Sequence, residues 1–312
     1  MQRIIIVLTL SIIVGVIAHS PALGGEYDSF DFSGRNLDWN SGFLLKDNQL
    51  LFANASETSA GDGNKASATA GKKEPSEEEI AEAINNPLSY LYLLWVQNDT
   101  MWFSGDALDK LDEDDKVMNT TLIQPIMPIQ LTENWKAIFR PIIPINSFDT
   151  ISELDVIQSE EEEPTLVADF DRETGLGDII LWTAFSNQYK PPNVFGFGPT
   201  VMMDTASDDS LGTGKWSAGP MALAFHIGDK WIYGAVAQHW WSFAGDDDRD
   251  SVNLTDVQYV LRYRVTPMTN IGFGPNIRIN WDADSDNRWS VPVGLGADTL
   301  IKLGPLPVKI GF

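Results

Sequence analysis

Three C-terminal segments of the sequence, 257–265, 271–281 and 289–301, each alternate apolar residues with polar residues or glycine, and several of the polar ones are basic or amide side chains. Because alternate residues of a β-strand point to one face, these side chains are expected to line a common surface. The set comprises Gln258, Arg262, Arg264, Asn276, Arg278, Asn280 and Asp298, joined by Lys136 and Arg140 from an earlier hairpin. Such a basic stripe attracts anions and the carboxylates of organic molecules. The alternative is a structural ladder in which the same cations pair with Asp178, Asp204 or Asp298.

The opposite positions of these segments are apolar or aromatic, as Tyr259, Ile277 and Val293 illustrate. A membrane barrel and a water-soluble sandwich both produce this alternation. Strand length favours the barrel, because ten residues rising about 3.3 Å each and tilted by about 45° span roughly 23 Å, close to the apolar band of an outer-membrane barrel. Aromatic residues at the strand ends predict the two girdles of that band: Trp231, Tyr233, Trp241, Phe243, Trp281 and Trp289.

Eleven segments fit the strand pattern: 90–103, 119–131, 135–146, 177–187, 193–204, 215–227, 231–243, 255–265, 269–281, 289–302 and 306–312. Longer, mostly acidic connections alternate with short turns at 132–134, 188–192, 228–230, 266–268 and 303–305. Outer-membrane barrels have short periplasmic turns and longer outer loops, so the N-terminus is expected in the periplasm. The sequence therefore predicts an all-β fold, an antiparallel transmembrane β-barrel of the outer membrane.

The strand count raises a question at the C-terminus. Bacterial single-chain barrels have even strand numbers, so eleven strands favour a C-terminally truncated chain whose complete barrel has twelve. The competing interpretation takes Leu306, Val308, Ile310 and Phe312 as a genuine final strand, since alternating apolar residues ending in Phe suit one.

The N-terminus has the layout of a secretory signal peptide. Arg3 precedes an apolar run from Ile4 to Ala18, and small residues follow, so residues 1–24 are expected to be removed near Gly24. A membrane anchor is the weaker alternative, because fifteen apolar residues are fewer than the roughly 20 that cross a bilayer. Residues 25–87 are then a flexible periplasmic segment, and 88–312 form the barrel.

One short helix is expected within that flexible segment. Residues 53–75 are small and polar, which predicts a linker. Ser76 and Glu79 form a capping-box pattern that begins a helix over 76–86, and Pro87 stops it. A solvated surface helix is the favoured interpretation over a plug.

Composition excludes several classes of function. The chain has 21 Lys and Arg against 44 Asp and Glu, a net charge of −23, and no cysteine. A polyanion repels phosphate backbones, so nucleic acid is not an expected partner. Of three histidines, His226 is expected on the inward face and His239 on the outward one, and neither HExxH nor GxSxG occurs. We therefore expect no enzyme and no cofactor.

Acidic clusters at 112–115, 160–163 and 246–248 could bind divalent cations beside lipopolysaccharide, although solvated loops are the more common outcome. Asp282, Asp284 and Asp286 imitate the start of a calcium loop, but Asn287 and Val293 stand where Gly and Glu are needed. No metal site is expected there.

Several segments resemble a known family: FGFGPTVMMDTASDDSLGTGKWSAGP (195–220), HWWSFAG (239–245), VQYVLRYRV (257–265), GPNIRINW (274–281), DNRWSVPVGLG (286–296) and LGPLPVKI (303–310). They are similar to the outer-membrane transporter family associated with the meta-pathway of phenol degradation, as is INNPLSYL (84–91) at the entry to the barrel. Family members continue past the equivalent of Ile310 into further strands. At His239 and Trp240 this sequence departs from the family, so no role transfers to that histidine.

The resemblance implies a channel or transporter for passive uptake or efflux of small molecules, including hydrophobic or aromatic compounds or organic anions. Expected partners are outer-membrane lipid, lipopolysaccharide and small solutes. The alternative is a structural or ligand-binding barrel with a closed lumen and acidic surface loops. Conductance would distinguish the two.

Overall fold

The computed structural model describes residues 4–16, 76–89, 91–104, 116–157, 165–187, 192–304 and 306–312. These residues form one α-helix, α1 (Glu77–Asn85), and a 3-10 turn, η2 (Asp209–Leu211). The strands are β1 (Ile4–Val16), β2 (Tyr92–Ser104), β3 (Lys116–Gln130), β4 (Trp135–Ile157), β5 (Thr165–Leu176), β6 (Ile180–Asn187), β7 (Asn193–Met202), β8 (Lys215–Ile227), β9 (Trp231–Gly245), β10 (Asn253–Thr266), β11 (Thr269–Phe273), β12 (Asn276–Asn280), β13 (Trp289–Ser290), β14 (Gly296–Leu303) and β15 (Leu306–Gly311).

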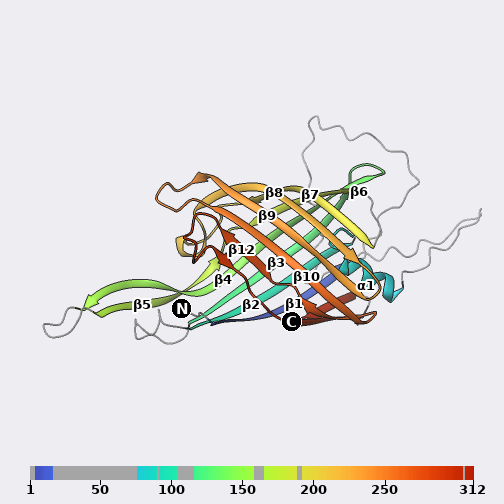
Figure 1. Cartoon of the computed structure of the whole chain (residues 1–312), viewed down its shortest axis with the longest axis horizontal. Coiled ribbons are helices and arrows are strands. Elements are labelled where there is room, and N and C mark those ends of the chain that lie inside the picture. Colours follow the sequence, from blue (N-terminus) through green and yellow to red (C-terminus); the bar gives the residue numbers. More distant parts are fainter. Residues whose placement is uncertain are drawn as a thin grey trace, which may run out of the picture. The chain divides into compact units, whose positions relative to one another are not determined.

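Antiparallel pairing of successive strands closes these elements into a barrel (Figure 1). The long strand β4 pairs with both β5 and β6, β10 pairs with both β11 and β12, and β15 pairs with β14 and β1. When β5–β6, β11–β12 and β13–β14 each count as one interrupted strand, the described residues contain twelve strand positions. The structure therefore confirms the predicted all-antiparallel twelve-strand barrel.

The eleven expected strands coincide with β2, β3, β4, β6 to β10, β11–β12, β13–β14 and β15. Two of them are interrupted, and a proline lies in each gap. Pro275 lies between β11 and β12, and Pro292 lies between β13 and β14. Proline has no N–H to donate to a strand ladder, so pairing stops locally while the chain continues in the same direction.

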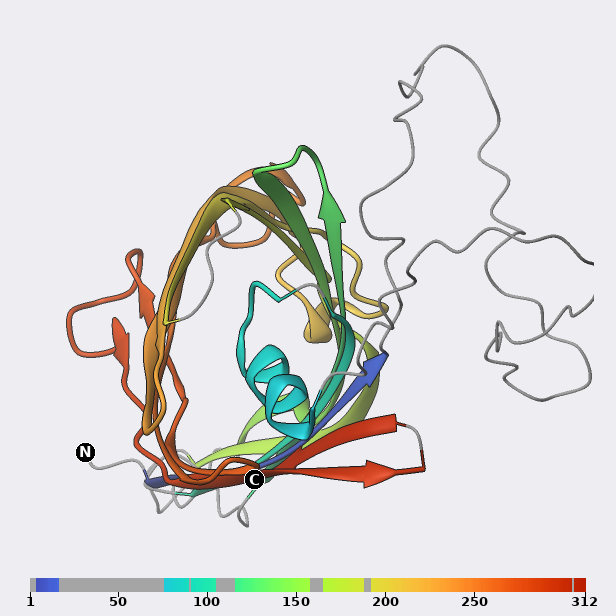
Figure 2. The same cartoon turned by 90° about the vertical axis from the view of Figure 1, so that its right-hand side faces the viewer.

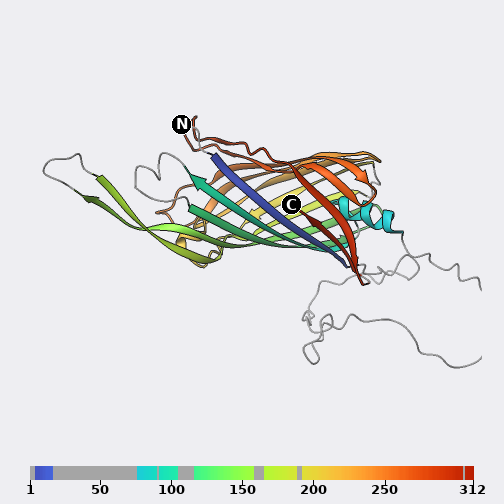
Figure 3. The same cartoon turned by 90° about the horizontal axis from the view of Figure 1, so that it is seen from below.

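The twelfth position in the ring is occupied by β1, which is a correction to the expectation that this strand would follow Phe312. β1 pairs with β2 over its whole length and with β15 over Ser11–Val14 (Figure 3). The segment reads IIIVLTLSIIVGV, in which β-branched residues predominate and none is charged. Such residues favour strands, and the facing edges of β15 and β2 supply partners for their backbone groups.

A second correction concerns the connection between the third and fourth expected strands. The sequence predicts a strand ending at residue 146 and a loop, whereas β4 continues to Ile157 and returns as β5, forming a hairpin that projects beyond the ring (Figure 1). An ion pair between Arg172 and Asp149 (3.1 Å) and a hydrogen bond between the Ser147 and Thr174 hydroxyls (2.8 Å) cross the hairpin. Acidic residues recur throughout this hairpin, which gives it the composition expected of a long acidic loop.

The short helix forms as predicted. Its capping box is complete, because Ser76 N donates to Glu79 Oε2 (2.7 Å) and Glu79 N donates to Ser76 Oγ (3.2 Å). No helix among the described residues has the length and apolar character needed to cross a membrane.

Candidate functional site in the barrel lumen

α1 lies inside the ring of strands, as the end-on view shows (Figure 2). Its apolar side chains Ile80 and Ile84 are buried, and Leu88 just beyond the helix is buried with them. They belong to one cluster with inward-facing strand residues: Leu93, Ile126, Ile138, Trp182, Ala184, Val194, Met221, Leu223, Phe225, Ile227, Ile232 and Val236. The expectation of a solvated surface helix was therefore wrong, since α1 fills part of the lumen.

The sequence could not reveal this placement, because the wall that receives α1 is assembled from strands distant in the chain. Ile80, Ala81 and Ile84 form the one apolar stripe of a helix rich in glutamate. That stripe packs equally well on any apolar surface. Only the folded barrel shows which surface it meets, because the contacts of α1 and Leu88 come from β4, β14 and β15.

Two lumen lysines hold the plug segment through neutral carbonyl oxygens. We use "plug segment" for residues 76–89. Lys309 Nζ donates to Asn85 Oδ1 (2.6 Å), and Lys136 Nζ donates to the backbone oxygen of Leu88. Gly196 on β7 leaves room for Leu88, because a Cβ there would lie 3.3 Å from Leu88 Cδ2.

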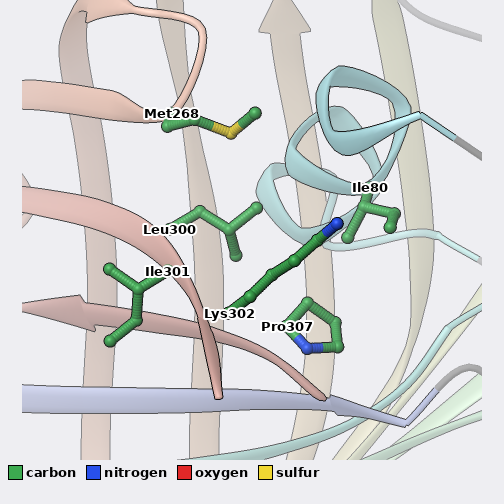
Figure 4. Close-up of a pocket in the computed structure, with 6 residues that line it drawn as sticks. All are labelled: Ile80, Met268, Leu300, Ile301, Lys302 and Pro307. Atoms are coloured by element: carbon green, nitrogen blue, oxygen red, sulfur yellow. The ribbon is translucent and has the colours of Figure 1, made fainter. Parts of the chain in front are cut away.

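A pocket lies between α1 and the part of the barrel wall formed by Met268, β14 and β15 (Figure 4). It is near the end of the barrel that carries the short turns 132–134, 228–230 and 266–268. Its walls are mostly apolar, with one ammonium group: Ile80, Met268, Leu300, Ile301, Lys302 and Pro307. The cavity is small, with a volume of about 40 Å³, and it opens to the surrounding space. The side chain of Lys302 extends toward α1 (Figure 4).

Lys136 and Arg140 both point inward from β4 and are buried. Arg140 lies 4.6 Å from the ring centroid of Trp95 and 5.2 Å from that of Trp182. Its Nε donates to Gln124 Oε1 (3.1 Å). A guanidinium held between two indole faces is stabilised by cation–π attraction, so Arg140 fixes the wall of the lumen.

Three further cations, two on β10 and one on β15, gather at Asp298 of β14 or beside it. Arg262 forms an ion pair with Asp298 Oδ2, and Lys309 Nζ lies 2.9 Å from Asp298 Oδ1. Asn270 Nδ2 also donates to Oδ1 (2.8 Å). Arg264 follows Arg262 on the same face of β10, opposite Asn270. Lys309 and Asn270 were not among the predicted lumen residues, although their positions alternate correctly within β15 and β11.

The predicted lumen residues nearer the other end form a second group. Arg278 Nε lies 3.4 Å from Asp256 Oδ2, and Asn276 Nδ2 donates to Asp256 Oδ1 (2.7 Å). Gln258 pairs with Asn276 in the strand register, and Asn280 pairs with Leu254. The Arg278 side chain is 67% exposed while Asp256 is 7% exposed, so the guanidinium remains open to solvent.

Both alternatives for the predicted basic stripe therefore apply in part: Arg278 remains exposed to solvent, whereas Arg262 is held in an ion pair. Asp298, one of the three suggested partners, does pair with Arg262. Asp178, another, instead anchors the loop between β7 and β8, because it accepts hydrogen bonds from the backbone N–H groups of Thr205 (3.2 Å) and Thr213 (2.6 Å).

That loop turns inward at the opposite end of the barrel from α1. Leu211 in η2 is buried, and its backbone oxygen accepts a hydrogen bond from Asn146 Nδ2 on β4 (3.2 Å). Gly175 allows this approach, because a Cβ there would lie 2.9 Å from Leu211 Cδ1. The loop thus narrows the lumen at its second end.

The six predicted girdle aromatics are all exposed on the outer face. Trp231 and Tyr233 lie at one end of β9, and Trp241 and Phe243 lie at the other, with exposed fractions between 48% and 67%. Trp281 and Trp289 are exposed near the second end. Trp231 contacts Tyr263 with ring centroids 5.0 Å apart, which adds a tyrosine to the first group.

Both histidines of the barrel lie on the outer face. His226 stacks on exposed Tyr233 at 4.8 Å, so the expectation that it points inward was wrong. In β8 the buried positions Met221, Leu223 and Ile227 are odd-numbered, which directs His226 outward. His239 contacts Trp241 at 3.9 Å, on the outer face as expected.

The acidic loops show no arrangement that would hold a metal ion within the described residues, where no group of three or more histidine or carboxylate side chains converges. The clusters at 112–115 and 160–163 lie outside the described residues. Asp282 accepts hydrogen bonds from Ser251 Oγ (3.0 Å) and Asn253 Nδ2 (3.1 Å), which is the environment of an ordinary loop carboxylate.

Comparisons of the chain with protein-family models, with curated proteins and with solved structures found no match. The lumen itself is therefore the basis for a functional argument.

Proposed function

We propose that this chain is an outer-membrane barrel that passes small solutes and that α1 closes its lumen as a plug. The observation that carries the proposal is the position of α1, a separate segment packed inside the ring by two isoleucines. A lumen sealed by wall residues alone would stay closed. A lumen sealed by a helix can open when that helix leaves, as in plugged outer-membrane barrels.

The outer surface supports the membrane location. Exposed aromatic rings occur at both ends of β9, and small residues such as Ala235 and Ala237 lie between them. Aromatic girdles that flank an apolar band are typical of outer-membrane barrels.

Residues 1–24 are proposed to direct export and to be removed near Gly24. The run of uncharged residues from Ile4 to Val16 is what export signals need. Cleavage would leave the facing edges of β15 and β2 free to pair with a strand other than β1. Retention would instead keep β1 as a barrel strand.

The solutes are proposed to be small molecules, including apolar or aromatic compounds and organic anions. The lumen supports both classes, because Trp182 and Phe225 contribute an apolar wall and Arg278 offers a solvent-exposed guanidinium. A second candidate function is a closed, ligand-binding barrel. The inward loop that carries Leu211 favours that alternative, since it narrows the end opposite α1.

Solute flux into liposomes separates these candidates. Three forms are compared: the full chain, a variant lacking 26–74 that keeps α1, and a variant lacking 26–87. We expect liposomes with the last variant to swell in an isotonic monosaccharide solution, and those with the other two to swell slowly. If none of the three forms admits the sugar, the closed barrel is the better account.

A further inference from the structure

The charged group around Asp298 has more cations than carboxylates. Arg262 and Lys309 both contact Asp298, and Arg264 lies two residues from Arg262 on the same inward face. One carboxylate thus serves a site with three cations. Concentrating like charges where water is scarce is unfavourable unless an anion joins them.

Arg264 supplies a second, independent sign of an incomplete site. Its Nε and Nη2 are buried and make no hydrogen bond among the described residues. Buried polar groups are nearly always hydrogen-bonded, so unsatisfied donors on a cation indicate that an acceptor belongs there.

The plug segment is attached at the same place. Lys309 Nζ, 2.9 Å from Asp298, also donates to Asn85 Oδ1 at the end of α1. Asn85 is a neutral amide, so its hydrogen bond with the Lys309 ammonium lacks the attraction between opposite charges that a carboxylate would add. A carboxylate ligand would therefore compete with Asn85 for Lys309.

The neighbouring pocket indicates what the rest of the ligand is like. Leu300, which lines it, is the cross-strand partner of Lys309 in the β14–β15 pair. Ile80 of α1, Met268 and Pro307 complete a mostly apolar surface (Figure 4). A short apolar chain attached to the carboxylate would lie against these side chains and against the helix.

We propose that Arg264 and Lys309 bind the carboxylate of a small amphiphilic acid, whose apolar chain enters the pocket beneath α1, and that this ligand displaces Asn85 and releases the plug segment. The inference rests on the proposed function, because it assumes that α1 is a removable plug. It adds the chemical class of the ligand and the contact through which it acts.

Accessibility of α1 tests this inference directly. The chain has no cysteine, so Ala81→Cys introduces a single thiol at a position that is 4% exposed while α1 is docked. The variant is purified in detergent, and its rate of modification by a polymer-linked maleimide is measured with hexanoate, with hexan-1-ol and with inorganic phosphate. Ala83→Cys, which is half-buried, provides a second reporter if the first folds poorly.

We expect hexanoate to accelerate labelling about tenfold, since replacing the neutral amide acceptor of Lys309 with a carboxylate shifts the docking equilibrium by about that factor. Hexan-1-ol, which has the same chain without the charge, should have little effect. Equal acceleration by hexan-1-ol would overturn the carboxylate assignment, and equal acceleration by phosphate would overturn the role of the apolar chain. No acceleration by hexanoate would overturn the inference.

Charge-removing variants locate the site. Arg264→Gln and Lys309→Gln should each abolish the response to hexanoate in the Ala81→Cys chain. The matched control is Arg172→Gln, which removes a guanidinium from the projecting hairpin, where Arg172 pairs with Asp149. A response that survives both lumen substitutions contradicts the site. Failure of the proposed function is separate, because it would appear as absence of flux through the variant lacking 26–87.

Discussion

The cations on the inner wall have different partners, and these partners indicate different roles. Arg140 is enclosed by Trp95, Trp182 and Gln124, which makes it a structural residue of the wall. Arg262 and Lys309 share Asp298. Arg278 keeps most of its surface open to solvent despite its contact with Asp256, so it is the residue best placed to act on a passing solute.

Arg140 should therefore matter for stability. Arg140→Met preserves much of the volume but leaves Gln124 Oε1 without its donor, and an unsatisfied buried acceptor costs about 1–3 kcal/mol. We expect a loss of that order in the free energy of unfolding, measured by denaturant titration in detergent. The double variant Arg140→Met, Gln124→Leu should recover part of the loss, because both polar partners are then removed. A double variant less stable than the single one would contradict this assignment.

Arg278 should matter for selectivity. In the variant lacking 26–87, we expect Arg278→Gln to shift the reversal potential toward cations, because it removes an exposed positive charge from the lumen. Arg262→Gln should shift it less, since Arg262 is already compensated by Asp298. A reversal potential unchanged by Arg278→Gln, or moved more by Arg262→Gln, would show that these charges do not select ions in this way.

At the scale of elements, α1 depends on its first turn. The Ser76–Glu79 capping box satisfies two backbone groups of a helix that is only nine residues long. Short helices are marginal without tertiary support, so the cap and the buried isoleucines must act together.

Ser76→Ala should weaken the plug. Loss of a serine N-cap costs about 1 kcal/mol of helix stability, which we expect to raise the labelling rate of Ala81→Cys several-fold. Glu82→Gln is the control, because it changes an exposed residue of the same helix outside the cap. Similar rates for Ser76→Ala and the parent chain would mean that α1 stays docked without its cap.

Most of the strands could be predicted because each one produces a local pattern of alternating residues in the sequence. Alternation in 257–265 and 231–243 marks both the strands and their two faces, and Ser76 with Glu79 marks the start of α1. The acidic residues of β5 indicate a loop. The pairing of β1 depends on the free edges of β2 and β15, which no local pattern shows. The docking of α1 and the Lys309–Asn85 contact join residues 224 positions apart, so no local pattern could show them.

At the scale of the whole molecule, residues 4–16 fit two roles: part of an export signal that is removed, or a permanent strand of the barrel. We predict that intact-mass measurement of protein isolated from outer membranes will show loss of residues 1–24. The matched control is a variant with Leu10→Arg in the apolar run, which should remain unprocessed because the run is interrupted. A mature protein that retains residues 4–16 would instead establish β1 as a permanent member of the barrel.

The central claim is that this barrel conducts solutes once α1 is absent. A lumen of twelve strands is intermediate between filled eight-stranded barrels and open sixteen-stranded ones, so size alone does not decide whether it conducts. The loop that carries Leu211 narrows the far end but, on this account, does not seal it. The variant lacking 26–87 can be used whether β1 is removed with the export signal or retained in the barrel. If β1 is retained, Val16 still pairs with Tyr92, so the shortened connection between β1 and β2 joins neighbouring strand ends.

Single-channel recording in a planar bilayer tests the claim most directly. The full chain and the variant lacking 26–74 should be silent or open only briefly, and the variant lacking 26–87 should show steady conductance steps. Silence of the variant lacking 26–87, or steady conductance of equal size in all three forms, would contradict the account.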